Sequence, residues 1–582
     1  MKKTTTILRI AFLGAFALLV SKTSFAQTKI EKIDQLMTMY SNYGKFNGTV
    51  LVSEKGKIIY KKAFGFANME WNVPNQTDTK FRLASVSKQF TAMLILQLVA
   101  EGKLKLNVPI STYLPDYPKK NADLITIHHL LTHTSGTPNL TSFASYQNEV
   151  YRPHTPEELV AQFADSTLEF KPGEKYNYSN SGYILLGYIM EKVTGKSYEK
   201  LIQEKIFTPL GMKNSGYDSN QTILKNRAGA YEMQGTNIIN ASYIDMSVPL
   251  SAGGLYSTVE DLYLWDQALY TDKLLPEKYL HLIFTGYIQS GGPYKYGYGW
   301  DIGKVKVGNT TEEVDVVQHS GGINGFSTLI TRIPSEQSAV ILLNNTGRTP
   351  LLRMVESIFG ILHDKSYDFP KKSIPNSLAR VMEKEGINKA LAYYKSIKDS
   401  STYYNDENEL IWAGYYFLQS DRAKEAAAIF KISTEAFPEA FNTYDSYGEA
   451  LLALGNKAEG IENYKKSLKL NPNNNGAMEV LKENGVNTDE LITKVPIEKL
   501  KQLEGTYVIA NPTSDREKMW KIEFKEVQGV LVGNDNGYRY KLTPMGDNQF
   551  INPDDGASIV FDSKDGKAIT MTLFKKFKFK KV

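Results

Sequence analysis

The 582-residue sequence contains no cysteine, little net charge and no apolar run long enough to cross a bilayer. Without cysteine the chain has no disulfide, no thiolate metal site and no cysteine nucleophile, so packing alone must stabilise it. Four of the five units of formal positive charge come from Lys2, Lys3, Arg9 and Lys22. The rest of the chain is therefore nearly neutral, which argues against a nucleic-acid-binding surface.

Residues 1–26 have the pattern of a signal peptide. Basic residues precede an apolar run from Ile10 to Val20, and Ser24-Phe25-Ala26 places small residues where a signal peptidase cleaves. The run is shorter than the ~20 residues that span a bilayer, so an uncleaved anchor is the less favoured alternative. We expect a mature chain that starts at Gln27 and is periplasmic or secreted.

The remaining length predicts about three domains. Residues 48–64 have the β-branched content and the central turn of a β-hairpin. Three more strands and an apolar helix are expected much later, at Val314–Gln318, Phe326–Ile333, Val340–Leu343 and Leu351–Leu362. This spacing predicts a five-stranded antiparallel sheet built from distant parts of the chain, with a mostly helical insertion, in a domain over 27–365.

A second domain is expected over 366–495, where the composition shifts to helix formers and a 34-residue period appears. Five positions recur one period later: Gly414, Phe417, Ala426, Phe430 and Pro438 correspond to Gly448, Leu451, Gly460, Tyr464 and Pro472. The period resembles that of tetratricopeptide repeats, whose paired helices need small residues at their close contact. Such an array either binds a protein partner or acts as a spacer.

A small β-sandwich or barrel is expected over 498–582, where short alternating segments are separated by Asn, Asp and Gly turns. The basic tail from Lys575 to Lys581 has Phe577 and Phe579 between its lysines. This alternation favours a strand with one solvated face over a ligand site.

The strongest chemical signal is Ser85-Val86-Ser87-Lys88, which opens the apolar run Phe90–Val99. On a helix, positions i and i+3 share a face, so the Lys88 amine can reach the Ser85 hydroxyl. Burial favours the neutral amine, which can accept the proton of a serine nucleophile. A second Ser-x-x-Lys at Ser197–Lys200 lies in a polar helical stretch and lacks this context.

Tyr178-Ser179-Asn180 precedes a second apolar helix, Tyr183–Val193. A Tyr178 oxygen there can shuttle a proton between nucleophile and leaving group, and the Asn180 amide can donate to a substrate carbonyl. The same triplet at Tyr40–Asn42 lies in a predicted N-terminal helix without a nucleophile.

His319-Ser320-Gly321-Gly322 closes the strand predicted at Val314–Gln318. Glycines at a strand end let a substrate approach the backbone, so the N–H groups of Gly322 and Ser85 are expected to form an oxyanion hole. The alternative is an ordinary turn between two strands.

In this order the three segments resemble the serine β-lactamase and penicillin-binding protein superfamily, and more narrowly its class C branch of β-lactamases, D-peptidases and esterases. The resemblance covers about 40–345. It includes further framework segments: Ile125–Gly136, Thr208–Met212, Ser251–Leu255 and Tyr296–Trp300. It implies an α/β fold, a sheet flanked by helices plus a helical lobe, with the cleft between them.

The resemblance also implies site roles. Ser85 is the nucleophile, Lys88 and Tyr178 the proton-transfer pair, Asn180 a substrate ligand, and His319, Ser320, Gly321 and Gly322 the substrate-binding strand; no cofactor or metal is implied. β-Lactamases of this branch usually have Lys where His319 stands, so a permanent cation for a substrate carboxylate is missing. His319 is expected to meet such a carboxylate best as imidazolium.

His128, His129 and His133 allow a metal site as an alternative, but core or loop-anchoring roles are favoured because no carboxylate completes a zinc site.

The expected function is hydrolysis, through an acyl-enzyme on Ser85, of peptides, amides or esters that contain D-amino acids, including peptidoglycan fragments. A broad-specificity carboxylesterase is one alternative. A slow β-lactam- or peptidoglycan-binding module, with helical repeats that contact a protein partner, is the other. Neither nucleic-acid binding nor stable membrane insertion is expected.

Overall fold

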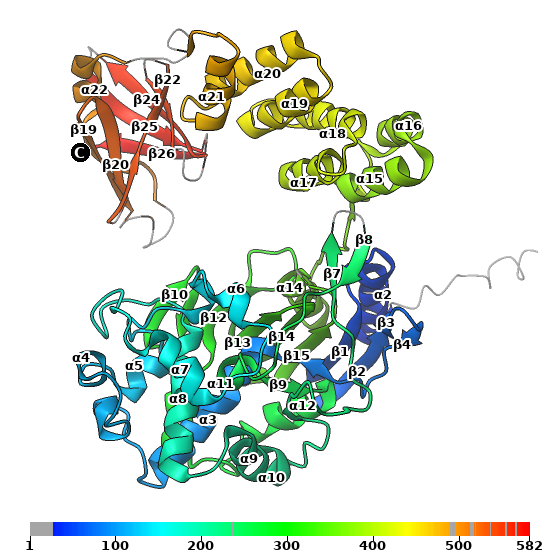
Figure 1. Ribbon diagram of the computed structural model, residues 1–582, viewed down its shortest axis with the longest axis vertical. Coiled ribbons are helices and arrows are strands. Elements are labelled where there is room, and N and C mark those ends of the chain that lie inside the picture. The colour runs from blue at the N-terminus through cyan, green and yellow to red at the C-terminus, as the bar shows by residue number, and fades with distance from the viewer. Residues whose placement is uncertain are drawn as a thin grey trace, which may run out of the picture. The chain divides into compact units, whose positions relative to one another are not determined.

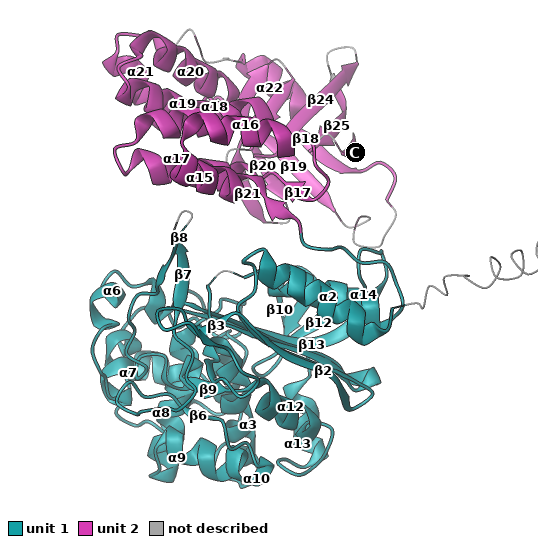
Figure 2. Cartoon of the chain, turned by 90° about the vertical axis from the view of Figure 1, so that its right-hand side faces the viewer, with its two compact units in different colours: residues 1–370 teal, residues 371–582 magenta. Residues whose placement is uncertain are grey.

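The computed structural model describes residues 27–582 apart from 235–236, 348, 489–490, 492–494, 513–516, 518–519, 536, 547, 553–555, 565–566 and 575. The predicted signal peptide lies outside the described residues. The chain forms two compact units that divide after Pro370 (Figure 2). None of the helices in the described part is both long and apolar enough to cross a membrane.

The first unit contains the expected α/β fold around an antiparallel sheet of eight strands. Their order across the sheet is β10 (Ile288–Gly291), β11 (Tyr294–Tyr296), β12 (Asp301–Lys306), β13 (Glu313–Ile323), β14 (Phe326–Ile333), β15 (Ser338–Asn344), β1 (Gly48–Glu54) and β2 (Lys57–Phe64). Gly48 pairs with Asn344, so the first strands lie beside the last (Figure 1). Distant parts of the chain therefore complete one sheet.

The sheet has three strands more than the five expected. The strands β10 and β11 are only four and three residues long, and β12 carries Gly303 and two lysines. Such segments have weak strand propensity of their own. Pairing with a neighbouring strand, here β12 with β13, holds them in the sheet.

Both faces of the sheet are covered. Val50 and Val52 of β1 contribute to a core with α2 (Lys29–Asn42) and α14 (Leu351–Leu362), whereas Leu51 belongs to the core on the opposite face. This two-sided burial explains the continuous apolar run of the strand.

The helical lobe between β2 and β10 is built around α3 (Ser87–Ala100), of which every residue from Ser87 to Leu98 is buried. The other helices of the lobe are α4 (Lys119–Ala122), α5 (Ile127–Leu131), α6 (Tyr146–Glu149), α7 (Pro156–Ala164), α8 (Asn180–Thr194), α9 (Tyr198–Ile202), α10 (Thr208–Leu210), α11 (Leu250–Gly253), α12 (Val259–Ala268) and α13 (Glu277–Ile283). Short strands complete it: β3 (Phe66–Asn68), β4 (Val73–Pro74), β5 (Phe81–Arg82), β6 (Gly216–Tyr217), β7 (Tyr231–Gln234), β8 (Asn237–Asn240) and β9 (Leu255–Ser257).

The second unit begins with helices that follow the 34-residue period. They are α15 (Ile374–Glu385), α16 (Ile387–Ile397), α17 (Glu407–Leu418), α18 (Ala423–Ala436), α19 (Phe441–Ala453), α20 (Lys457–Leu470) and α21 (Asn475–Glu483), with a short β16–β17 pair (Lys372–Ser373, Tyr403–Tyr404). A Cβ on Gly414 would lie 2.2 Å from the Phe430 ring, and one on Gly448 would lie 2.8 Å from the Tyr464 ring. The repeated glycine and aromatic positions are thus facing partners within helix pairs.

The unit ends in an all-β region with one helix, α22 (Ile497–Leu503), against it. Nine antiparallel strands form one sheet, in the order β21 (Tyr538–Lys541), β20 (Val530–Asp535), β19 (Lys521–Val527), β18 (Gly505–Ile509), β26 (Phe577–Lys581), β25 (Lys567–Leu573), β24 (Ser558–Lys564), β23 (Gln549–Ile551) and β22 (Thr543–Gly546). In β26, Phe579 is buried and Lys578 and Lys580 are exposed, which confirms a strand with one solvated face.

Candidate active site

Ser85 lies in a one-turn helix, Ala84–Val86, that leads directly into α3. The preceding Ala84 has φ 48°, a left-handed conformation that is unusual for a residue other than glycine. Neighbours hold this turn in place, since the Thr328 hydroxyl donates to the Leu83 carbonyl oxygen at 2.8 Å. Ser85 itself is half-buried and accessible to a substrate.

The Lys88 amine is fully buried and has three oxygen neighbours. Its Nζ lies 3.1 Å from Ser85 Oγ, 2.8 Å from Asn180 Oδ1 and 2.9 Å from the Ala252 carbonyl oxygen. Burial holds the pKa of Lys88 well below its usual value, which favours the neutral amine. A neutral amine has two N–H groups and one lone pair. The two carbonyl oxygens can only accept, so they take both N–H groups and leave the lone pair for the Ser85 hydroxyl.

Tyr178 and Asn180 reach the same point from the start of α8. The Tyr178 ring centroid lies 4.8 Å from Lys88 Nζ. Burial raises the pKa of Tyr178 above its usual value, and a hydrogen bond with Ser85 only partly opposes this, so the phenol is protonated at neutral pH. With Oδ1 of Asn180 engaged by Lys88, its amide nitrogen has, among the described residues, only a long contact, 3.4 Å, to Asn139 Oδ1. That nitrogen is the group left to donate to a substrate.

The strand β13 borders this cluster with an open edge. Its pairing with β12 ends at Gln318, so within the described part of the chain residues 319–323 have no strand partner on that side. Gly321 packs on the Ser85 turn, because a Cβ there would lie 2.2 Å from the Leu83 carbonyl oxygen. Gly322 is exposed with open space around its Cα. A substrate backbone can therefore lie along this edge next to Ser85.

His319 is buried and engaged on both ring nitrogens, contrary to the expected cationic role. Nδ1 lies 2.6 Å from the Ser320 carbonyl oxygen and so must donate, which leaves Nε2 to accept from the Tyr296 hydroxyl at 2.9 Å. Burial lowers the pKa of His319 to about 3. An imidazolium that meets a substrate carboxylate at neutral pH is therefore not supported. The sequence pattern gave no sign of the burial that causes this.

The three earlier histidines occupy different environments. Nδ1 of His128 lies 2.8 Å from the Tyr298 hydroxyl, and His129 caps the first turn of α5. His133 is buried beside the Tyr178 segment. Across the described residues no three potential ligands gather in a metal-binding group.

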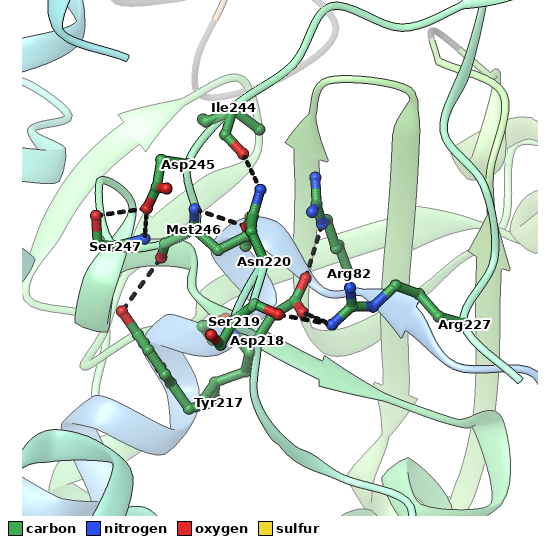
Figure 3. Close-up of polar contacts among 12 residues, drawn as sticks. Arg82, Tyr217, Asp218, Ser219, Asn220, Arg227, Ile244, Asp245, Met246 and Ser247 are labelled. Carbon is green, nitrogen blue, oxygen red and sulfur yellow. Dashed lines mark hydrogen bonds and ion pairs between the residues drawn. The ribbon is translucent and has the colours of Figure 1, made fainter. Parts of the chain in front are cut away.

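A polar network not predicted from the sequence links segments that lead to the site (Figure 3). Asp218 accepts from Arg82 Nε at 2.8 Å and from Arg227 Nη2 at 2.6 Å. Asn220 donates from Nδ2 to the Ile244 carbonyl oxygen and accepts at Oδ1 from the Met246 N–H. The network thus joins β5, just before Ser85, to the loop that leads into α11, where Ala252 contacts Lys88. The spacing of these polar residues matches no known motif, so only the fold brings them together.

Comparison with known proteins identifies the family of this chain. The family described as Beta-lactamase matches residues 31–358, more than half of the chain. Penicillin-binding protein 4* of Bacillus subtilis (strain 168) is 32% identical over 59% of this chain and 79% of its own length. PbpX of the same organism, also named as a penicillin-binding protein, is 31% identical over 59% of this chain and 82% of its own.

Among solved structures, the D-amino acid amidase from Ochrobactrum anthropi SV3, complexed with L-phenylalanine, is 25% identical. It covers 57% of this chain and 98% of its own, with a TM-score of 0.50. These matches and the Ser85 cluster agree that the chain belongs to the beta-lactamase family of serine hydrolases.

Proposed function

We propose that this hydrolase cleaves amides, peptides or esters of D-amino acids through a covalent acyl-enzyme on Ser85. The observation that carries the proposal is the hydrogen-bond pattern of Lys88. Two carbonyl oxygens take its N–H groups, so its lone pair is directed to the Ser85 hydroxyl. A buried neutral amine in that position is a general base.

In the proposed acylation step, Ser85 Oγ attacks the substrate carbonyl carbon while its proton moves to Lys88 Nζ. The backbone N–H groups of Ser85 and Gly322 stabilise the oxyanion. When the tetrahedral intermediate collapses, the bond to the leaving group breaks and Tyr178 delivers a proton to the departing nitrogen or oxygen. Lys88 then returns its proton to Tyr178, and both groups are ready to activate the water that hydrolyses the acyl-enzyme.

Because His319 is neutral, we expect that a substrate bound along the β13 edge does not need a carboxylate group there. A cation is the usual partner for a substrate carboxylate, and burial keeps His319 uncharged. In amides and esters of D-amino acids the carboxyl group is blocked and uncharged, so these substrates do not need a cation. The similar Ochrobactrum anthropi protein is named as a D-amino acid amidase. Peptidoglycan fragments are included because relatives are named as penicillin-binding proteins.

Two further proposals concern location and partners. Residues 1–26 direct export to the periplasm or the medium. Cell fractionation of a tagged full-length chain tests this.

The helical repeats contact a protein partner. Affinity capture tests this by comparing residues 371–582 with the catalytic unit.

One substrate panel tests the proposed function with purified full-length protein. It contains a D-amino-acid nitroanilide, a D-alanyl-D-alanine peptide, a short-chain nitrophenyl ester and a chromogenic cephalosporin, each assayed with Ser85→Ala as control. The D-amino-acid nitroanilide is expected to be cleaved, and its L-enantiomer much more slowly. Activity on the plain ester alone would favour the carboxylesterase, and stable labelling without turnover would favour the binding module.

A further inference from the structure

His133 packs against Tyr178 and has an unusual backbone conformation. Its backbone has φ 57°, a left-handed conformation that is rare outside glycine, asparagine and aspartate. Its side chain is only 1% exposed. A strained backbone and a buried polar ring beside a reactive group need a reason.

His133 binds the chain on both sides of Tyr178. Its carbonyl oxygen accepts from the Asn177 N–H at 2.9 Å, and its Nδ1 accepts from the Ser179 N–H at 3.1 Å. Its ring also lies against the Tyr178 ring, with centroids 4.3 Å apart and planes inclined by 35°. The residue thus fixes both the backbone and the ring plane of Tyr178.

The protonation state of His133 follows from these bonds. Because Nδ1 accepts from a backbone N–H, the proton of the neutral ring is on Nε2. Among the described residues Nε2 has no hydrogen-bond partner, and the rings of Tyr178, Tyr183 and Tyr296 lie against the His133 ring. Burial lowers the pKa of His133 well below its usual value. The neutral ring therefore persists at neutral pH and its acceptor remains available.

We propose that His133 is a positioning residue, whose Nδ1 acceptor holds Tyr178 where it can protonate the leaving group. This inference rests on the proposed role of Tyr178 in proton transfer. An amide needs that proton because its amine cannot leave as an anion, whereas a nitrophenyl ester releases a stable phenolate. Misplacement of Tyr178 must therefore slow amide cleavage much more than ester cleavage.

The test compares kcat/KM for a D-amino-acid nitroanilide with kcat/KM for the nitrophenyl ester of the same D-amino acid. His133→Gly relieves the backbone strain and removes the acceptor. His133→Asn tolerates the left-handed backbone and keeps an acceptor oxygen close to the Nδ1 position. Tyr178→Phe is the reference for loss of the proton donor, and His128→Asn is the matched control at a histidine that contacts Tyr298 instead.

We expect His133→Gly to lower the amide-to-ester ratio by about tenfold or more, as Tyr178→Phe does, because small displacements of a reacting group have large effects on rate. His133→Asn should keep the ratio close to that of the native protein. His128→Asn should change both substrates alike.

A ratio in His133→Asn as low as that in Tyr178→Phe would overturn the proposal, even if His133→Gly does not fold. An unchanged ratio in folded His133→Gly would overturn it as well. If Tyr178→Phe itself leaves the ratio unchanged, the proposed role of Tyr178 fails instead, which separates the two failures.

Discussion

At the scale of single residues, the chemistry of this protein depends on which groups burial keeps neutral. A lysine amine is ordinarily cationic, and a histidine ring ordinarily titrates near neutral pH. Burial excludes water from Lys88 and His319 and lowers the pKa of each, so both are neutral at neutral pH. For Lys88 the loss creates a base, and for His319 it removes a cation. One physical cause therefore underlies both the proposed mechanism and the proposed substrate preference.

Lys88→Ala is expected to slow acylation by ~10² or more, the usual effect of losing a positioned base. Stopped-flow labelling with a penicillin or a fluorophosphonate measures this step. Because only neutral Lys88 accepts the proton, the native acylation rate should hold at neutral pH and fall as pH decreases through the lowered pKa of Lys88. An acylation rate that rises only near the ordinary lysine pKa would show that the amine is charged.

A second residue-scale prediction concerns His319. With its pKa lowered to about 3, His319 keeps one charge state from about pH 5 to about pH 9. The kcat/KM ratio of a carboxylate-bearing peptide to a neutral ester should therefore stay constant over this range. His319→Lys adds a cation and should raise the ratio. A ratio that falls through about pH 6.5 in the native protein would mean that His319 is solvated.

At the scale of elements, the Ser85 turn depends on close contact with β13. A Cβ at Gly321 would lie 2.2 Å from the Leu83 carbonyl oxygen and 2.4 Å from Thr328 Oγ1. Gly321→Ala should thus lower the free energy of unfolding by roughly 1–3 kcal/mol, the usual cost of overpacking. Gly322→Ala, with open space at its Cα, is the control and should unfold like the native protein in urea. Equal stability of the two variants would mean that the turn can move away from β13.

The helix pairs of the second unit permit a similar test. Gly414→Ala places a methyl group 2.2 Å from the Phe430 ring and should destabilise the array by roughly 1–3 kcal/mol. Gly476 lies in α21 with only an ordinary contact, 3.5 Å from Asn474 Oδ1. Gly476→Ala should therefore be neutral or stabilise by about 0.5–1 kcal/mol through helix propensity. Thermal unfolding of residues 371–582 measures both, and similar melting of the two variants would contradict the helix packing.

Elements with a strong pattern of their own could be predicted from the sequence. Helices α3 and α8 and strands β1 and β15 carry long apolar runs, so their type and place were evident. Strands β10 to β12 owe their conformation to pairing, and the contacts of Arg82 with Asp218 and of Asn220 with Met246 depend on tertiary structure. Ser85 and Lys88 could be placed together because their i, i+3 spacing puts them on one helical face, and Tyr178 was assigned from its segment and the family resemblance, whereas the charge of His319 depends on burial.

At the scale of the whole molecule, the catalytic unit extends slightly beyond the expected end at 365. The Ser366 carbonyl oxygen accepts from the Asn309 N–H at 3.1 Å, and the Asp368 carbonyl oxygen accepts from the Ser357 hydroxyl at 3.0 Å. These contacts fix residues 366 and 368 against the β12–β13 loop and the middle of α14. A boundary after Pro370 keeps them intact.

We therefore predict that residues 27–370 alone fold and hydrolyse small esters at a rate similar to that of the full chain. All the proposed catalytic groups lie within this range, which has its own hydrophobic cores. Size-exclusion chromatography and ester assays check this. Aggregation of residues 27–370, while the full chain stays soluble, would mean that the second unit is needed for folding.

The central claim is that Ser85 becomes acylated with Lys88 as its base. Mass spectrometry of the full-length protein, quenched during turnover of a slow substrate such as a penicillin, measures it most directly. We predict one added acyl mass on the peptide that contains Ser85, slow formation of this adduct in Lys88→Ala, and none in Ser85→Ala. An adduct on another residue, or undiminished hydrolysis by Ser85→Ala, would contradict the mechanism.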